Sequence, residues 1–521
     1  MITYERLRAM DPAAWRAAGV AWGALVETVD RPAGAIRSGA NGLRVVWSGA
    51  AAGAADGRLA ALRAELAGSR PVLIEIDQLL AEYAEQLARA RAMLAAAGPS
   101  TGAPRPGGEM PGGGIPGGET TGGAETALAL ARRADRRAAR ALTELAADAR
   151  TGWTAPPPAG RPPATAGPLA VWHWWQRLAP AQRRWLLGRE PALVGRLDGV
   201  PVAARDQANR LLLADQRAEL RARRARLLAQ RPATAAGAAE LARLDGLLDG
   251  LADVEHRLAA RNGPRAYLLS LDPAGDGRAV VALGNPDRAD NVLTYVPGMT
   301  SDLPGLRGEL DRAERLAARC GELAPTRQSA AVLWLDYDAP DFVDEAAGAK
   351  RAEVAAPGLH RFQEGLRLTH ETAEGSTATR TVVGHSYGSL VVGSAARDHG
   401  LAADNLVLVG SPGVGVDHAA RLSAPGTAVW ASTAANDVIQ YAARSPGEAL
   451  AGLAAGVALP GLGLPLVLGR PGEQLWFGRN PVDPGFGARV FAGAPRGHTG
   501  YWDAGNPALD SMARIALGVA P

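Results

Sequence analysis

Short apolar segments separated by helical segments fill the sequence after residue 263. Eight of these segments are typical of strands, and they cover 266–272, 279–284, 291–298, 330–338, 379–384, 405–413, 427–432 and 488–493. The stretch "PAGDGR" joins the first two as a hairpin, whereas helical stretches separate most of the others. Strands that alternate with helices form parallel sheets covered by helices on both faces. Residues 263–521 are therefore predicted to form an α/β domain with an eight-stranded, mostly parallel sheet.

The stretch "VVGHSYGSLVVG" places a serine between two glycines at the end of the fifth predicted strand. Ser386 lies directly before a predicted helix that ends at Gly400. In a chain with 64 glycines, a Gly-x-Ser-x-Gly match alone can arise by chance. At a strand-to-helix junction, however, it matches the nucleophile elbow of α/β-hydrolases, where glycines permit a strained serine and close packing. We therefore predict that Ser386 is a nucleophile.

The α/β-hydrolase fold orders its catalytic residues as serine, acid and histidine along the chain. A serine hydroxyl needs a general base within hydrogen-bonding reach, and three histidines follow Ser386. His498 follows the last predicted strand, where the base is expected, so we predict it as the base. The alternatives are His399, near the end of the helix that follows Ser386, and His418, after the sixth strand.

The acid is expected in the loop after the seventh strand. The stretch "TAVWASTAANDVIQ" places Asp437 there, where it would orient His498 and stabilise the imidazolium. Aspartates also commonly cap helices, so a capping or surface role for Asp437 stays open. Asp483 and Asp417 are the alternative acids.

An oxyanion hole needs backbone N–H donors. One is expected from Tyr387, directly after the nucleophile. The second is expected from the loop after the third strand, "YVPGMTSD", in which Gly298 permits a tight turn and Met299 or Thr300 supplies the donor. A plain turn at "PGMT" is the alternative interpretation.

Four separated motifs resemble those of an actinobacterial α/β-hydrolase family that was long catalogued as a domain of unknown function. They occur in order over about 170–521, and they are "WWQRLAPAQRRWLLGREPALVGRLDGVPVAARDQANR", "VVGHSYGSLVVG", "VLVGSPGVGVDHAARL" and "NPVDPGFGARVF". The resemblance implies the α/β-hydrolase fold and a serine-hydrolase triad. It implies no particular substrate.

A nearly uncharged segment, 449–469, lies between the predicted acid and base. It is long enough to span a bilayer, but its prolines and glycines favour an apolar loop or a broken helix. We expect either a lid, in which Leu464 offers apolar surface to an acyl chain, or core packing. His385 and His418 are further substrate-pocket candidates, although His385, adjacent to Ser386, also fits a structural role.

Two low-complexity stretches divide the first half of the chain. Residues 98–123 predict a flexible linker rich in glycine and proline, and residues 154–168 predict a stiffer, proline-rich connector. Between them, residues 124–153 predict an arginine-rich amphipathic helix. Residues 169–262 predict a helical region whose tryptophans are expected to anchor packing, and these are Trp172, Trp174, Trp175 and Trp185.

Residues 1–97 predict a helical hairpin with its bend at "WSG". Gly49 permits the reversal, and Trp47 is expected to pack across the helix pair. The tripeptide resembles that of the W-x-G hairpin proteins handled by ESX (type VII) secretion, which implies a helical partner or export by that route. Two features differ, because Pro32 should kink or break the first helix and no Tyr-x-x-x-Asp/Glu motif occurs at Tyr83. A plain helical hairpin that packs on a partner is the alternative.

Composition argues against several other functions. The net charge is only +3, and no basic run with interleaved aromatic residues predicts nucleic-acid binding. Cys320 is the only cysteine, which excludes an intramolecular disulfide and a multi-cysteine metal site. Asp336 and Asp338 have no histidine beside them, so we interpret them as loop carboxylates and expect neither a metal nor a cofactor.

The N-terminal residues have charges of both signs and no apolar core, so we expect no Sec signal peptide. We also expect no integral membrane span, and a location either in the cytoplasm or outside the cell after type VII export.

These features predict a serine hydrolase that cleaves a small-molecule or lipid carboxylic ester through an acyl-enzyme at Ser386. A non-catalytic scaffold or partner-binding protein of a type VII-linked assembly is the alternative hypothesis. Because residues 98–123 are expected to be flexible, we also expect residues 1–97 to be dispensable for the chemistry.

Overall fold

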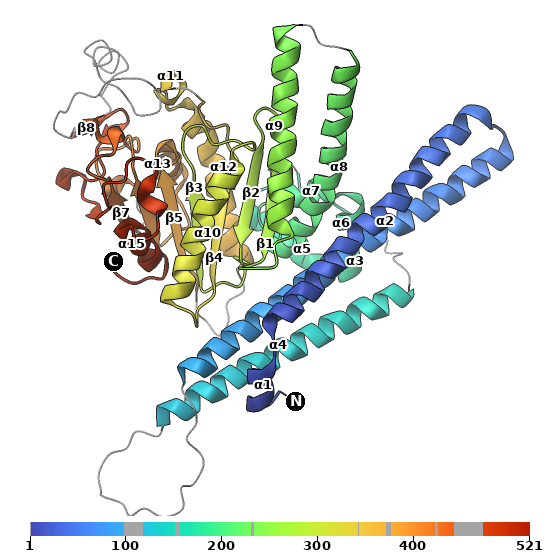
Figure 1. Cartoon of the computed structure of the whole chain (residues 1–521), viewed down its shortest axis with the longest axis horizontal. Helices are drawn as coiled ribbons and strands as arrows, with labels where there is room; N and C mark the ends of the chain where they lie inside the picture. The colour runs from blue at the N-terminus through green and yellow to red at the C-terminus, as the bar shows by residue number, and fades with distance from the viewer. Residues whose placement is uncertain are drawn as a thin grey trace, which may run out of the picture.

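A computed structural model shows a helical first half followed by a sheet with helices on both faces (Figure 1). The structure describes residues 2–97, 118–151, 157–163, 165–230, 234–341, 343–370, 377–422, 426–441 and 473–521. The predicted fold class, an α/β-hydrolase fold preceded by an all-α N-terminal half, is confirmed.

Long helices make up the N-terminal region, and they are α1 (Tyr4–Ala9), α2 (Pro12–Val46), α3 (Ala50–Ala96) and α4 (Gly118–Thr151). Helices α2 and α3 form a hairpin, and α4 packs along α3 (Figure 1). The predicted break at Pro32 is wrong, because α2 continues through this residue while it packs along α3. Gly49 has a φ of 104°, which reverses the chain as expected. Trp47, however, is 42% exposed, so packing across the pair covers it only in part.

A second helical region connects α4 to the sheet through α5 (Pro168–Arg177), α6 (Pro180–Arg189), α7 (Pro191–Arg196), α8 (Val202–Ala229) and α9 (Ala235–Leu258). Trp175 is buried in its own small core, against which Trp174 and Trp185 pack. These tryptophans therefore anchor packing, as expected. Within the part of the chain that the structure describes, no helix combines the length and apolar character that crossing a bilayer requires.

The sheet has eight strands in the order β1-β2-β4-β3-β5-β6-β7-β10. Its strands are β1 (Ala266–Asp272), β2 (Arg278–Leu283), β3 (Asn291–Val296), β4 (Ser329–Leu335), β5 (Thr379–His385), β6 (Asn405–Val409), β7 (Ala428–Ser432) and β10 (Arg489–Val490). β1 and β2 form the expected antiparallel hairpin, and β2 pairs antiparallel with β4. From β4 to β10 the neighbouring strands are parallel.

The larger helices of this domain are α10 (Leu306–Leu323), α12 (Lys350–Thr369), α13 (Tyr387–His399) and α15 (Pro507–Ala516). Shorter elements are α11 (Val343–Ala346), the 3-10 turns η1 (Ala419–Arg421), η2 (Val438–Tyr441), η3 (Pro484–Phe486) and η4 (Gly500–Trp502), and the two-stranded ribbon β8 (Gln474–Leu475) and β9 (Gly478–Arg479).

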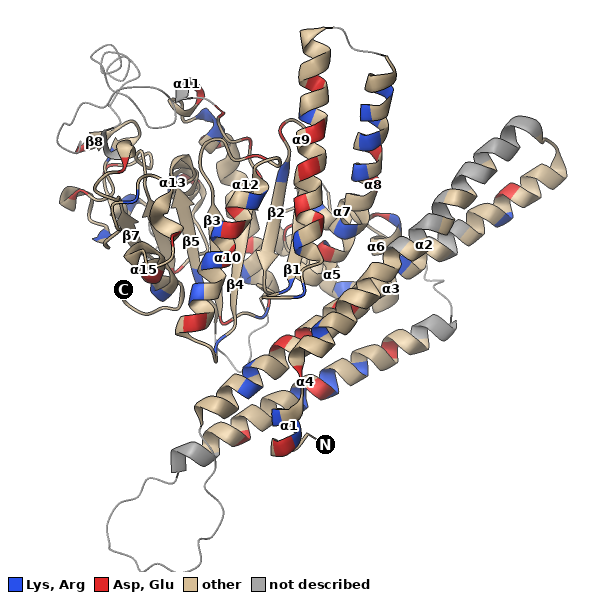
Figure 2. Cartoon of the chain, in the orientation of Figure 1, with Lys and Arg blue, Asp and Glu red and all other residues tan. Residues whose placement is uncertain are grey.

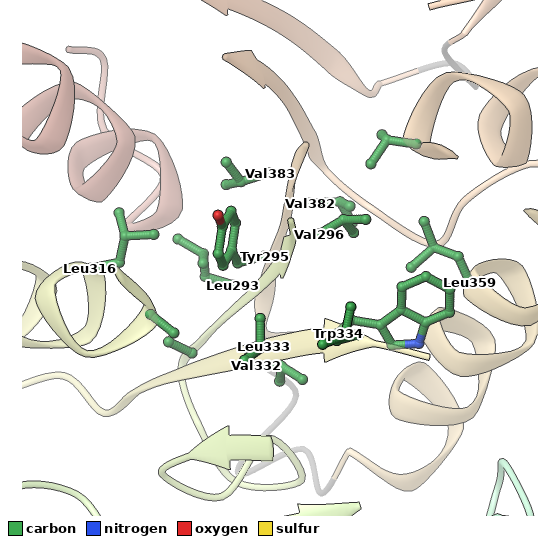
Figure 3. Packing of buried hydrophobic residues seen from close by; sticks show 14 of the residues in the cluster. Leu293, Tyr295, Val296, Leu316, Val332, Leu333, Trp334, Leu359, Val382 and Val383 are labelled. Atoms are coloured by element: carbon green, nitrogen blue, oxygen red, sulfur yellow. The ribbon is translucent and has the colours of Figure 1, made fainter. Parts of the chain in front are cut away.

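Buried side chains on the two faces of the sheet pack against different helices (Figure 3). Tyr295 and Leu293 of β3 lie on the side of Leu316 in α10, whereas Trp334 of β4 lies on the side of Leu359 in α12. All five side chains are at most 2% exposed. Strands buried on both faces read as continuous apolar runs, which explains why the sequence predicts them well.

A buried cluster of ion pairs joins the N-terminal hairpin to the start of β1. The Arg265 side chain is completely buried, and its guanidinium lies 2.6 Å from Asp77 of α3 and 2.7 Å from Asp206 of α8. Arg16 of α2 contacts the other oxygen of Asp77 at 3.2 Å. Burial alone would raise the pKa of Asp77 and Asp206, but the guanidiniums of Arg265 and Arg210 hold both below their usual range.

This ion-pair cluster argues against the expected independence of residues 1–97. A chain that lacks α2 and α3 would lose Asp77, one of the two carboxylates that contact the buried Arg265 guanidinium. A buried charge that loses its partner is strongly destabilising. The α2–α3 hairpin therefore belongs to the folded body that supports the sheet.

Candidate active site

Ser386 lies at the turn between β5 and α13, and its backbone has φ 53° and ψ −130°. This is the strained conformation expected of an elbow serine. A Cβ on Gly384 would lie 2.6 Å from Ser389 Cα, and one on Gly388 would lie 2.3 Å from the carbonyl oxygen of Pro297. Only glycine fits at either position, so the two glycines permit the close packing of strand and helix that the sequence predicted.

The Ser386 hydroxyl makes no capping hydrogen bond to α13, although the residue stands at the N-cap. Its backbone is instead held on both sides. The Ser386 N–H donates to the Val409 carbonyl at 3.0 Å, and the Ser389 hydroxyl donates to the Ser386 carbonyl at 2.6 Å. The backbone of Ser386 is therefore held in place, while its Oγ does not cap α13.

The structure brings Asp437 and His498 together from loops 61 residues apart. His498 Nδ1 lies 2.9 Å from Asp437 Oδ1 and 3.0 Å from Oδ2. A carboxylate only accepts, so Nδ1 carries the proton and Nε2 is left free to accept one. The Asp437 side chain is fully buried, whereas that of His498 is 28% exposed.

Two further donors hold the Asp437 carboxylate. The Tyr501 hydroxyl donates to Oδ2 at 2.5 Å, and the Ile439 N–H donates to Oδ1 at 2.9 Å. Burial and the Asp437 charge both raise the pKa of Tyr501, so its hydroxyl stays protonated as a donor. Sequence reasoning missed Tyr501, and its only signal was an aromatic residue three positions after His498 in "GHTGYW".

Gly410, directly after β6, is another residue that sequence reasoning missed. Its φ is 54°, and a Cβ there would lie 2.9 Å from Asp437 Oδ2 and 3.2 Å from the His498 ring. The missing side chain therefore makes room for the Asp437–His498 pair. A glycine directly after a strand, in "VLVGSPG", was the available signal.

Among the described residues, no hydrogen bond joins Ser386 to His498. Gly298 of the loop after β3 faces the serine, since a Cβ on it would lie 3.2 Å from Ser386 Oγ. In unliganded enzymes the bond between nucleophile and base is often long and shortens only with substrate.

Of the residues predicted for the oxyanion hole, Thr300 is wrong. The Thr300 N–H donates to the Pro340 carbonyl at 2.8 Å, so it is not available for an oxyanion. Tertiary packing of the loop after β4 supplies this acceptor, which the local sequence does not reveal. Met299 remains as the candidate donor from this loop, and Tyr387 begins α13, where the first N–H groups have no partner within the helix.

His385 is buried next to His498, with only 3% of it exposed. Its Nε2 donates to the His498 carbonyl at 2.8 Å, and the two rings lie 4.7 Å apart. Burial, followed by the neighbouring His498 and Arg312, lowers the pKa of His385 well below its usual value. Because it holds the backbone of His498, a structural role fits His385 better than a place in the substrate pocket.

The other predicted candidates are placed as follows. His418 Nδ1 accepts from the Ala420 N–H and so caps η1. His399 lies against His360 at the far end of α13, with ring centroids 5.9 Å apart. Leu464 and the whole segment 449–469 lie outside the described residues.

The two alternative acids are engaged elsewhere. Asp483 accepts from the Gly485 N–H and pairs with Arg479 at 2.8 Å, and Asp417 accepts from the Arg479 N–H. Neither makes a hydrogen bond to His498 within the described parts of the chain. Asp437 is the acid that the structure brings to this histidine.

The carboxylates after β4 have separate surroundings. Asp338 pairs with Arg351. Burial and the nearby Asp198 raise the pKa of Asp336 to about 6. In the regions that the structure describes, no group of three or more metal-ligating side chains is gathered.

Comparison with known proteins places the chain in a family. Residues 272–446 match the model of a family described as alpha/beta hydrolase. Uncharacterized protein Rv0963c of Mycobacterium tuberculosis is 34% identical over 196 residues, which span 35% of this chain and 71% of that protein. The chain belongs to the alpha/beta hydrolase family.

This alpha/beta hydrolase also resembles a longer relative, uncharacterized protein Rv2079 of Mycobacterium tuberculosis. The two are 32% identical over 394 residues, which span 68% of this chain and 56% of that protein. The chain thus spans little more than half the length of this relative.

Two solved structures show weak likeness to this alpha/beta hydrolase. One is a hyperthermophilic esterase from the archaeon Pyrobaculum calidifontis, with 14% identity, a TM-score of 0.29, and coverage of 54% of this chain and 92% of that chain. The other is carboxyl esterase 2 from the fungus Tuber melanosporum, with 12% identity, a TM-score of 0.27, and coverage of 49% and 85%. Likeness at this level says nothing about the activity of this chain.

Proposed function

We propose that this protein is a serine hydrolase that cleaves carboxylic esters through an acyl-enzyme at Ser386. The observation that supports it is the convergence of three features at the carboxyl edge of the sheet. These are the strained Ser386 after β5, the hydrogen-bonded pair of Asp437 and His498, and the facing backbone of the loop after β3. A hydrogen-bonded acid and base beside an elbow serine support nucleophilic catalysis.

In the proposed acylation step, Ser386 Oγ attacks the ester carbonyl carbon while His498 Nε2 takes the hydroxyl proton. The carbonyl oxygen becomes an oxyanion, to which the Tyr387 and Met299 N–H groups donate. Asp437 stabilises the imidazolium and holds its orientation. The intermediate then collapses, the bond to the alcohol breaks, and His498 gives the proton to the leaving alkoxide.

Deacylation repeats the same steps with water as the nucleophile. His498 Nε2 removes a proton from water, and the hydroxide attacks the acyl carbon bound to Ser386. The acid product leaves as His498 returns the proton to Ser386 Oγ. The exposed fraction of the His498 side chain, 28%, gives water access to this base.

The test is active-site labelling with a fluorophosphonate probe, combined with hydrolysis of p-nitrophenyl esters of graded acyl length. We expect wild-type protein to be labelled at Ser386, and Ser386→Ala to lose both labelling and turnover with an unchanged circular dichroism spectrum. Ser394→Ala is the matched control, because Ser394 is a buried serine of α13 with no hydrogen-bond partner for its hydroxyl. Turnover by a folded Ser386→Ala variant would refute the assignment.

A non-catalytic scaffold is the competing function. The lack of a hydrogen bond between Ser386 and His498 among the described residues favours it if the two residues never come into contact. A folded wild-type protein that reacts with no fluorophosphonate and hydrolyses no ester would establish this alternative. A helical partner of residues 1–97 and export by a type VII route remain hypotheses from the sequence resemblance.

A further inference from the structure

A large cavity lies between the helical region and the edge of the sheet opposite Ser386. Its volume is about 700 Å³, and it is bounded by α3, α4 and the residues that precede three parallel strands. Asp290 precedes β3, Gln328 precedes β4 and Ala378 precedes β5, and all three line the cavity. Because Ser386 follows the seven residues of β5, the cavity lies roughly 20 Å from the serine.

Basic side chains dominate the walls of this cavity. They are Arg89 of α3, Arg133 and Arg137 of α4, and Arg288, Arg327 and His370 of the α/β domain. Asp290 is the single acidic residue among the described lining residues, and it pairs with Arg89 at 3.0 Å. The basic residues continue along the middle of α4, as Figure 2 shows.

The arginines occupy two facing walls with different exposure. Arg89, Arg288 and Arg327 are half-buried at the base of the cavity, whereas Arg133 and Arg137 are exposed on α4. Backbone contacts fix the base, because Arg89 donates to the Thr326 carbonyl at 2.9 Å and Arg327 donates to the Leu517 carbonyl at 2.7 Å. Arg89 pairs with Asp290, and Arg288 pairs with Glu82 at 2.6 Å. Guanidiniums keep their charge at any physiological pH, and the five arginines of the cavity outnumber these two carboxylates, which favours an added anion.

We propose that this cavity binds a soluble ligand that has two or more phosphoryl groups. Guanidinium groups bind phosphate oxygens through paired, charge-assisted hydrogen bonds, and arginines on two walls suit a ligand with more than one such group. The volume is that of a small-molecule site. A bilayer surface could reach the exposed arginines of α4 but not the half-buried arginines at the base between α4 and the sheet.

This site is separate from the proposed ester chemistry, because it lies at the opposite edge of the sheet. Its ligand would contact both the helical region and the α/β domain, since the lining residues come from both. Binding to the folded state alone raises the unfolding temperature by mass action. The ligand would therefore stabilise the packing of α3 and α4 against the sheet.

Inorganic triphosphate is the probe, titrated into the full chain by calorimetry, with the unfolding temperature measured in parallel. We expect saturable binding at one site and a higher unfolding temperature. In Arg133→Gln/Arg137→Gln the dissociation constant should rise about 10- to 100-fold, because two charge-assisted contacts are lost. These side chains are exposed on α4, so the variant should fold.

The matched control is Arg221→Gln/Arg226→Gln, which removes the same charge from exposed positions of α8. Its dissociation constant should stay within about twofold of wild type, since distant exposed charges are screened by salt. Equal weakening in both double variants, or no saturable binding by wild type, would overturn the proposal. The protein could instead bind anionic vesicles or single-stranded RNA in a way that triphosphate does not displace and that Arg136→Gln/Arg140→Gln abolishes. That result would overturn the cavity proposal in favour of a binding surface on α4.

Discussion

Two fully buried aspartates, Asp437 and Asp206, illustrate two different uses of a buried carboxylate. Asp206 contacts the completely buried Arg265, whose charge is permanent, so the pair contributes a fixed connection between helices and sheet. Asp437 contacts His498, whose side chain is 28% exposed and can exchange a proton with solvent or substrate. The type of partner and its exposure, more than the burial of the acid, separate a candidate catalytic cluster from a structural one.

The largest effect is expected on kcat, from a change at Asp437. In Asp437→Asn, the His498 tautomer and orientation should no longer be fixed, and kcat for a p-nitrophenyl ester should fall on the order of 10⁴-fold. Asp483→Asn is the matched control, because Asp483 only caps η3 and pairs with Arg479. Should Asp483→Asn reduce kcat as much as Asp437→Asn, the acid has been misassigned.

A change at Arg265, the partner of Asp206, should lower stability with little change in activity. Arg265→Met leaves Asp77 and Asp206 buried without their shared partner, so the free energy of unfolding should fall by about 3–5 kcal/mol in chemical denaturation. Arg367→Met removes an exposed pair with Glu364 and should change it by less than about 1 kcal/mol. A loss of ester turnover per folded molecule in Arg265→Met would contradict the separation of the two clusters.

Features that depend on local sequence could be predicted before the structure was known. The strands were predicted to within a few residues, and β1 to the residue, because strands buried on both faces are continuous apolar runs. The elbow at Ser386 was predictable because its glycines are local. Asp437 and His498 were predicted as acid and base from the order of residues along the fold, and the structure shows a contact between them although they lie 61 residues apart.

What the sequence missed depends on tertiary neighbours. The ion pair of Asp77 with Arg265 spans 188 residues, and no local pattern indicates that the hairpin is fastened to the sheet. Thr300 lost its predicted oxyanion role to the Pro340 carbonyl, which arrives from the loop after β4. Pro32 is tolerated inside α2, where local sequence alone predicted a break.

A smaller effect is expected at Gly410, which tests whether the candidate catalytic pair of Asp437 and His498 depends on the space beside it. In Gly410→Ala the new Cβ would lie 2.9 Å from Asp437 Oδ2, so the Asp437–His498 pair must shift. Misplacement of reacting groups by up to an ångström reduces rates by up to about 10²-fold, and we expect a loss of kcat within that range.

Gly505→Ala is the control for Gly410→Ala. Gly505 has a similar positive φ of 74°, but nothing lies within 4 Å of an added Cβ. Both variants should lose stability from backbone strain, and only Gly410→Ala should lose turnover per folded molecule. If both variants keep full turnover, the pair tolerates the added methyl group and Gly410 has only a conformational role.

The smallest expected effect is the contribution of His385, beside the candidate catalytic pair, to the pH dependence of stability. Burial lowers the pKa of His385 well below its ordinary value, so the folded state keeps a neutral imidazole while the unfolded chain takes up a proton below about pH 6.5. This contribution to stability should therefore fall as pH decreases from about 6.5, by at most about 1.4 kcal/mol per pH unit. Asp336 acts in the opposite direction, because burial and Asp198 raise its pKa to about 6 and it takes up a proton in the folded state. The lowered pKa values of Asp77 and Asp206 act only at lower pH, below about 4, where the unfolded carboxylates gain protons.

Denaturant unfolding of wild type and His385→Gln between pH 7 and pH 5 separates the two contributions. The glutamine amide can still donate to the His498 carbonyl, as His385 Nε2 does at 2.8 Å, but it does not titrate. The free energy of unfolding should thus fall less steeply with decreasing pH in the variant than in wild type. The two slopes should differ by at most the slope that one bound proton produces. Identical slopes for the two proteins would mean that His385 becomes protonated in the folded state, which would require the ring to be open to solvent and would undo its role behind His498.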